Sequence, residues 1–124
     1  MKPVMQTRIS GPLANCFTAC LASILELAIE DIPDFYRTVP ASQAIKETNR
    51  WLAHRDLQLV TLRSAEHLLP KAYMIAEGLG PRGRRHAVVH FGDVAVHDPH
   101  PSGEGLKAVD VYRLFVAVHP HKVT

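Results

Sequence analysis

Residues 15–28 read Asn-Cys-Phe-Thr-Ala-Cys-Leu-Ala-Ser-Ile-Leu-Glu-Leu-Ala. Their apolar residues recur every three to four positions, which is the spacing of one buried face of an α-helix. Asn15 is a favourable N-cap residue, and Gly11 and Pro12 break regular structure shortly before it. We therefore predict a helix over residues 15–28, with Cys16 in its first turn.

Cys16 is open to two interpretations at this position. The free N–H groups and the dipole of a helix N-terminus favour negative charge, which lowers the pKa of a thiol and makes it a nucleophile. Cysteine also serves as a small apolar residue in protein cores, and this applies to Cys20 as well. The stretch alone does not separate the two.

Length and composition define the class of protein. With 124 residues, of which 47% are apolar, we expect one domain over residues 1–124 with a single core. The net charge of +2 is too small to indicate a nucleic-acid partner. No run approaches the roughly 18 apolar residues that a membrane span needs, and no apolar segment precedes Cys16 as a secretory signal would.

The two cysteines predict the cellular compartment. Cys16 and Cys20 would lie one turn apart on a single helix, where bridging geometry is poor. We therefore expect free thiols, a reducing environment and a cytoplasmic location.

The remaining chain predicts a second helix and a series of strands. Residues 33–41 hold two prolines and are predicted to be a loop, from which Phe35 and Tyr36 fold back onto the core. Ser42 can cap a helix that extends to about Arg55. A single helical turn is expected at residues 64–69. Short apolar or β-branched runs predict strands at residues 57–62, 72–76, 86–91, 94–98 and 109–118.

Strands joined by tight turns, with no helices between them, indicate an antiparallel sheet. The predicted fold class is therefore α+β, with the N-terminal helix packed on a sheet of about five strands. Residues 78–85 form a predicted surface loop whose arginines are either solvated or, beside a cleft, able to bind a carboxylate or phosphate.

A thiol nucleophile needs a base to take its proton and a third group to orient that base. His86 opens one strand of the predicted hairpin and Asp98 closes the other, with the turn at Gly92-Asp93. A two-residue turn alone pairs Ala87 with Asp98 and places His86 on the opposite face. An odd-length loop or a β-bulge brings His86 and Asp98 to one face.

Cys16 on a helix, then His86 on a strand, then Asp98 on the next strand resembles the order of the papain-like cysteine peptidases. The likeness is greatest to their small bacterial branch, which includes the double-glycine leader peptidases. Residues 15–23 look like the nucleophile helix of that group, and residues 86–90 and 96–101 look like its histidine and aspartate strands. The whole sequence is also similar to small uncharacterised papain-like proteins of bacteria and their phages.

The resemblance implies a papain-like fold and a hydrolase that needs no cofactor. Cys16 would be the nucleophile, His86 the general base and acid, and Asp98 the orienting group. The family's oxyanion-binding glutamine corresponds to Gln6, although Gln6 lies ten residues upstream, farther than is usual. The side chain of Asn15, or the backbone N–H of Cys16, is the alternative donor.

The substrate implied by the resemblance is a peptide or protein, cleaved at a peptide, isopeptide or other amide bond. A chain of this size has no second domain to build a deep cleft, so we expect a shallow substrate site. Trp51 and the loop that carries Arg84 and Arg85 are the candidates to border it. The sequence gives no indication of the oligomeric state.

Two other functions remain open from the sequence. A metal site could draw on the histidines and the aspartate of the second half, although no His-Glu-x-x-His or Cys-x-x-Cys motif is present. Its candidate ligands are His86, His90, His97, Asp98 and His100. A papain-like domain can also act as a non-catalytic binding or inhibitor module, because a fold does not fix a function.

Overall fold

A computed structural model describes residues 1–9, 11, 14–63 and 69–118 of the chain. Helices fill the first half of the described chain and strands the second. The elements are α1 (Cys16–Leu25), η1 (Ile29–Asp31), α2 (Phe35–Thr38), α3 (Ala41–Leu52), η2 (Ala53–Arg55), β1 (Leu57–Leu62), β2 (Tyr73–Leu79), β3 (Arg85–Phe91), β4 (Val94–His97) and β5 (Ala108–Ala117).

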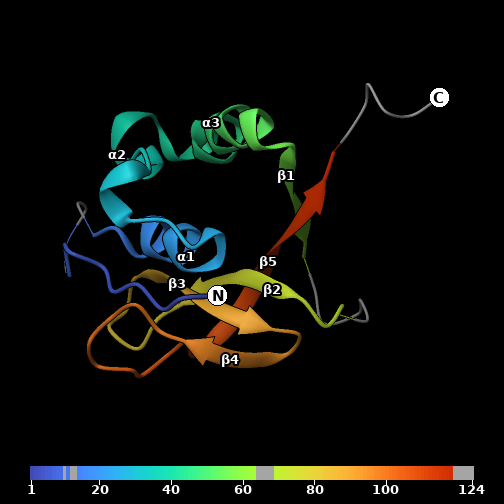
Figure 1. The fold of residues 1–124 in the computed structure, drawn as a ribbon. Helices are drawn as coiled ribbons and strands as arrows, with labels where there is room; N and C mark the ends of the chain where they lie inside the picture. The colour runs from blue at the N-terminus through green and yellow to red at the C-terminus, as the bar shows by residue number, and fades with distance from the viewer. Residues whose placement is uncertain (10, 12–13, 64–68, 119–124) are drawn as a thin grey trace.

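The five strands form one antiparallel sheet in the order β1-β5-β2-β3-β4. The last strand therefore inserts between β1 and β2, while β4 lies at an edge. The α-helices gather on one side of this sheet, with α1 against β2 and β3 (Figure 1). The predicted α+β class and the antiparallel sheet of about five strands are confirmed.

Helix α1 begins at Cys16 as predicted but ends at Leu25, three residues before the predicted end. Glu26 adopts a left-handed conformation with φ 58°, and its N–H bonds the carbonyl of Ala22, which closes the helix. The carboxylate of Glu26 also accepts a hydrogen bond of 2.9 Å from the N-terminal ammonium of Met1. The chain start thus lies beside the end of α1.

The segment predicted as a loop at residues 33–41 contains a short helix, α2. Phe35 is buried at its first position, and Tyr36 packs against the core, as expected. Helix α3 follows with Pro40 as its N-cap residue, so Ser42 lies inside the helix rather than at its cap. The helical turn predicted at residues 64–69 lies, apart from its last residue, outside the described residues.

Strand β2 does not stop before Gly78 but continues through it to Leu79. At this point the pairing of β2 with β5 shifts by one residue, between Glu77 and Gly78. A Cβ atom at Gly78 would overlap the carbonyl of Ala108 on the neighbouring strand. Glycine therefore lets the two backbones approach closely at this bulge, and does not end the strand.

The hairpin of β3 and β4 has the predicted turn at Gly92-Asp93. It also has an irregular pairing, which determines which side chains lie on the same face of the sheet. Phe91 pairs with Val94 and His90 with Ala95, but Val89 pairs with His97. Val96 is therefore an extra residue in β4, a β-bulge. The extra residue reverses the alternation of side chains after it, because successive side chains in a strand point to opposite faces.

The core lies between α1, α3 and the sheet. Its buried residues include Leu21 of α1, Leu52 of α3, and Ile75 and Val89 of the central strands, each with no accessible surface. Of the helices in the described ranges, none has both the length and the apolar character that crossing a membrane requires.

Candidate active site

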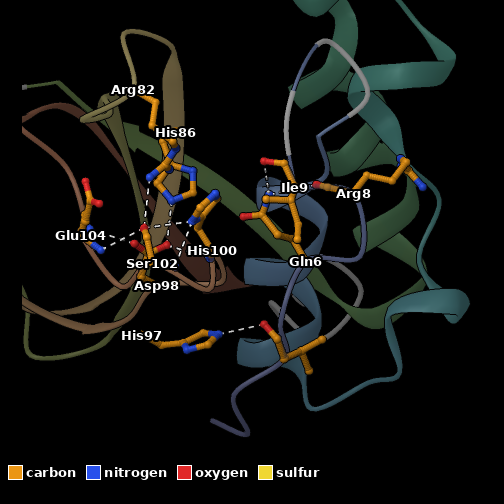
Figure 2. A network of polar contacts seen from close by, with 12 residues as sticks. Gln6, Arg8, Ile9, Arg82, His86, His97, Asp98, His100, Ser102 and Glu104 are labelled. Atoms are coloured by element: carbon orange, nitrogen blue, oxygen red, sulfur yellow. Dashed lines mark hydrogen bonds and ion pairs between the residues drawn. The ribbon is translucent and has the colours of Figure 1, made fainter.

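His86 and Asp98 form the centre of a polar network at the start of β3 and the end of β4 (Figure 2). Nε2 of His86 lies 2.7 Å from Oδ1 of Asp98. The same carboxylate accepts the backbone N–H of His100 at 2.9 Å and that of Gly105 at 2.8 Å. The Val96 bulge places both side chains on one face, and only 6% and 9% of their surfaces are exposed.

The charge of Asp98 is held by these hydrogen bonds. Burial alone would raise the pKa of Asp98, but the hydrogen bonds from His86, His100 and Gly105 outweigh it and hold the pKa below its ordinary value. A carboxylate can only accept hydrogen bonds, so Nε2 of His86 carries the proton directed at Asp98. In the neutral ring, Nδ1 of His86 then has the free lone pair.

Cys16 is half-buried at the first position of α1, and both cysteines are free thiols. Burial raises the pKa of Cys16, and the nearby charge of Glu77 adds to the effect. Backbone N–H groups of Ala87, Phe17 and Cys16 itself lower the pKa but do not compensate. The lowered pKa predicted from the helix N-terminus is therefore wrong, because desolvation exceeds the stabilisation that the free N–H groups supply.

Cys16 and His86 line the same pocket, whose volume is about 430 Å³. Ala87, whose N–H lies against Sγ of Cys16, directly follows His86 in β3. Within the described part of the chain, no hydrogen bond joins Sγ of Cys16 to His86. Catalytic hydrogen bonds are often long in proteins without bound substrate, so the shared pocket is the relevant observation.

Asn15 lines this pocket, but its amide is used to hold the N-terminal arm. Its Oδ1 accepts the backbone N–H groups of Thr7 and Arg8, both at 3.0 Å, and its Nδ2 donates to Oγ1 of Thr7 at 2.8 Å. Asn15 is the N-cap residue of α1 by position, without a side-chain capping bond. Its predicted role as an oxyanion donor is not supported by these contacts.

Gln6 is buried beside the residues that follow β4, because its N–H donates to the carbonyl of Pro99 at 3.0 Å. Its Nε2 donates to the carbonyls of Arg8 at 2.9 Å and Ile9 at 3.4 Å. Figure 2 shows it between His100 and the Arg8–Ile9 segment. In this arrangement the amide donates within the arm, and Gln6 is not among the pocket's lining residues.

Of the three predicted substrate-binding residues, two line the pocket and the third lies elsewhere. Trp51 contacts the ring of Phe35 at 5.9 Å between centroids and is covered by the guanidinium of Arg55, away from the pocket lining. Arg84 and Arg85 do line the pocket. The sequence therefore placed the arginines at the correct border, whereas Trp51 serves the packing of α3.

The pocket also contains a charged group that the sequence analysis did not identify. Arg113 of β5 donates from Nε to the carboxylate of Glu77 at 2.5 Å and from Nη1 to Oγ1 of Thr61 at 2.7 Å. The hydroxyl of Tyr36 also bonds Arg113, and burial raises the pKa of Tyr36 to about 12. Glu77 as the one charged residue of strand β2 was the available signal, because a buried charge needs a partner.

The histidines proposed as metal ligands have other contacts. The ring of His90 packs on Tyr112, Nε2 of His97 lies 2.8 Å from the carbonyl oxygen of Val4, and Nδ1 of His100 bonds Ser102. No group of three or more His, Cys, Asp or Glu residues able to hold a metal ion occurs among the residues described. The metal-dependent alternative therefore gains no support from the arrangement of side chains.

The chain matches no protein-family model, no curated protein and no solved structure in the three comparisons made. Function is therefore inferred from the pocket that Cys16 and His86 share.

Proposed function

We propose that the protein is a papain-like thiol hydrolase that cleaves a peptide, isopeptide or other amide bond through Cys16, His86 and Asp98. The observation that carries this proposal is the pocket lined by both Cys16 and His86, with His86 oriented by the 2.7 Å contact to Asp98. Thiol, imidazole and carboxylate are the three groups that nucleophilic acyl transfer requires.

The resting state we infer is a neutral pair, not a thiolate and an imidazolium. Burial raises the pKa of Cys16, so its thiol is protonated at neutral pH. His86 then acts as a general base, taking the proton on Nδ1 as sulfur attacks the carbonyl carbon. Asp98 stabilises the imidazolium formed, because its carboxylate stays ionised.

The attack produces a tetrahedral oxyanion that needs hydrogen-bond donors. The backbone N–H of Cys16 lies in the first turn of α1, where N–H groups have no partner within the helix. Such a donor typically contributes about 3 kcal/mol to the transition state. Gln6 joins it only if its amide leaves the carbonyls of Arg8 and Ile9.

The second half of the reaction restores the enzyme. The imidazolium of His86 protonates the leaving amine as the C–N bond breaks, which leaves an acyl thioester on Cys16. Water attacks the thioester with His86 as base, releasing the carboxylic acid and the thiol. We infer a peptide or protein substrate, and a cytoplasmic location that keeps the thiol reduced.

Alkylation with iodoacetamide followed by mass spectrometry tests this proposal. We expect labelling of Cys16 at neutral pH, while Cys20, which is fully buried, serves as the internal control. His86→Ala should slow labelling of Cys16 at pH 7 about tenfold or more, because the thiol then lacks its base. Equal rates in the wild type and His86→Ala would refute the proposed role of His86.

Turnover is tested with a panel of acyl amides and peptides, measured as release of the amine. Cys16→Ala should abolish release, and a metal chelator should leave it unchanged. If Cys16→Ala retains the biological effect of the protein in its host, the chain acts as a binding module instead. Loss of turnover with chelator alone would indicate a metal-dependent hydrolase.

A further inference from the structure

We propose that the pocket beside Cys16 selects acyl donors that carry a carboxylate next to the scissile bond, with Arg113 and Arg84 as the anion-binding residues. This inference rests on the proposed thiol hydrolase function and names its substrate class, an acidic peptide or acyl group. The argument uses the orientation of Arg113, the charge balance of the pocket and the position of Arg84.

Arg113 is a buried and pre-oriented cation, with 13% of its side chain exposed. Its Nε–H is held by Glu77 and its Nη1 by Thr61, and these two contacts fix the plane of the guanidinium. A guanidinium has five N–H donors, so further donors remain on the side of Arg113 that lines the pocket. Tyr36, whose pKa of about 12 keeps it protonated, adds a hydroxyl to the same wall.

The carboxylates around the pocket are already paired. Glu77 binds Arg113, Asp34 binds Arg8 and also lies 3.6 Å from Arg37, and Asp110 binds both terminal nitrogens of Arg85 at 2.7 and 2.9 Å. The charge of Asp98 is balanced once His86 takes the thiol proton. The carboxylates named here therefore leave no negative charge over for a basic substrate.

Arg84 is the cation of the pocket lining for which the described residues provide no ion pair. It is exposed at the border of the pocket, in the turn that joins β2 to β3, two residues before His86. With Arg37 sharing Asp34, the pocket and its surroundings carry an excess of positive charge. An anion near Cys16 would be attracted, and a cation would meet an unpaired guanidinium.

The geometry favours a carboxylate close to the reacting carbonyl. The pocket of about 430 Å³ is lined by both Arg113 and Cys16, so a small acyl group bound at Cys16 lies in the same pocket as the Arg113 guanidinium. The planar fork of a guanidinium matches the two oxygens of a carboxylate. An acidic residue at or beside the cleaved bond satisfies both conditions.

Two alkylating reagents that differ only in charge provide the test. The sulfur attacks the same CH2 carbon in iodoacetate and iodoacetamide and displaces iodide from both, but only iodoacetate carries a carboxylate. We expect the ratio of the iodoacetate to the iodoacetamide rate at Cys16 to exceed that of a short cysteine peptide about tenfold. The ratio should fall about threefold in Arg84→Gln, which leaves Arg113 in place, and should decline as salt is added.

Matched variants distinguish an effect of the arginines that line the pocket from an effect of the overall charge of the protein. Arg50→Gln removes an exposed arginine of α3 that does not line the pocket, and it should leave the ratio unchanged. The double change Glu77→Gln and Arg113→Gln removes both charges of the buried pair, so neither charge is left without its partner. When this double change is combined with Arg84→Gln, the ratio of the two alkylation rates should fall below its value in Arg84→Gln alone.

The outcomes distinguish this inference from the proposed function. A wild-type ratio equal to that of the free peptide, or a ratio that Arg84→Gln does not change, overturns the inference even if iodoacetamide labelling depends on His86. A raised ratio that Arg84→Gln lowers, and that the combined variant lowers further, supports it. If labelling does not depend on His86, the hydrolase proposal fails and the acidic substrate class falls with it.

Discussion

Asp98 lies 2.7 Å from Nε2 of His86, and the two side chains meet because Val96 is an extra residue in β4. A regular hairpin with the same Gly92-Asp93 turn would place Asp98 opposite Ala87, with its side chain on the other face of the sheet. The contact that orients His86 therefore depends on the irregular pairing of β3 with β4 at Val96.

Asp98→Asn should change how stability depends on pH. The pKa of Asp98 is lowered in the folded protein, so protonation favours the unfolded state, whose carboxyl titrates near pH 3.9. The stabilisation by Asp98 is therefore complete above about pH 5 and is lost as pH falls through the folded pKa. Asn cannot titrate, and it loses hydrogen-bond energy of about 1–3 kcal/mol at pH 7.

Urea unfolding of both proteins from pH 7 to pH 3 measures this effect. The difference in the free energy of unfolding should be largest at pH 7 and should shrink below about pH 4. Because the other acidic groups are common to both proteins, their contributions cancel. A difference that stays constant across this range would contradict the assignment of the lowered pKa to Asp98.

Asn15→Ala should release the N-terminal arm from the start of α1. The side chain of Asn15 holds the N–H groups of Thr7 and Arg8 and the hydroxyl of Thr7, and it is buried. Hydrogen exchange should accelerate at the amides of Thr7 and Arg8, with a loss of about 1–3 kcal/mol in stability. Asn15→Asp keeps the Oδ1 acceptor and should preserve most of the protection.

Gly78→Ala should destabilise the protein by about 3 kcal/mol or more, because the new methyl group would overlap the backbone carbonyl of Ala108. Backbone atoms on both sides leave no rotamer to relieve the contact. Gly83→Ala is the matched control, since Gly83 has φ 81° and open space around its Cβ position. It should cost only about 1–2 kcal/mol. Equal thermal stability of the two variants would rule out the close approach.

Local patterns in the sequence were sufficient for most elements. The helix face of residues 15–25, the strand at residues 57–62 and the turn at Gly92-Asp93 follow from spacing and turn chemistry within a few residues. Helix α2 was missed because Pro33 and Pro40 indicate a loop. The burial of Phe35 was predicted, but burial of one side chain does not specify the helical backbone of the segment that carries it.

The site was only partly predictable, for physical reasons. Cys16, His86 and Asp98 could be named because cysteine is rare in this chain and the predicted hairpin brings His86 near Asp98. The raised pKa of Cys16 could not be predicted from the sequence, because it results from burial, and burial depends on what packs over the helix N-terminus. The pairing of Glu77 with Arg113 spans 36 residues of sequence and depends on β5 inserting beside β2.

Deleting Val96 should remove the bulge and keep the contact between His86 and Asp98. Without this residue, His97 still pairs with Val89, and β4 pairs regularly with β3. Asp98 then lies opposite Val88, two residues from His86, so the side chains of His86 and Asp98 stay on one face. Val96 is 43% exposed, so the deletion removes little buried surface. We expect the deletion variant to fold with reduced stability and to label Cys16 at pH 7 at close to the wild-type rate, well above the rate of His86→Ala.

Val96→Thr is the control for this deletion, because it keeps the length of β4 and changes only an exposed side chain that tolerates polarity in a strand. It should label at the wild-type rate. Near-ultraviolet circular dichroism of both variants would verify that they remain folded. A folded deletion variant whose labelling falls to the level of His86→Ala would contradict this account. The bulge itself, and not only the position of Asp98 opposite Val88, would then be needed to orient His86.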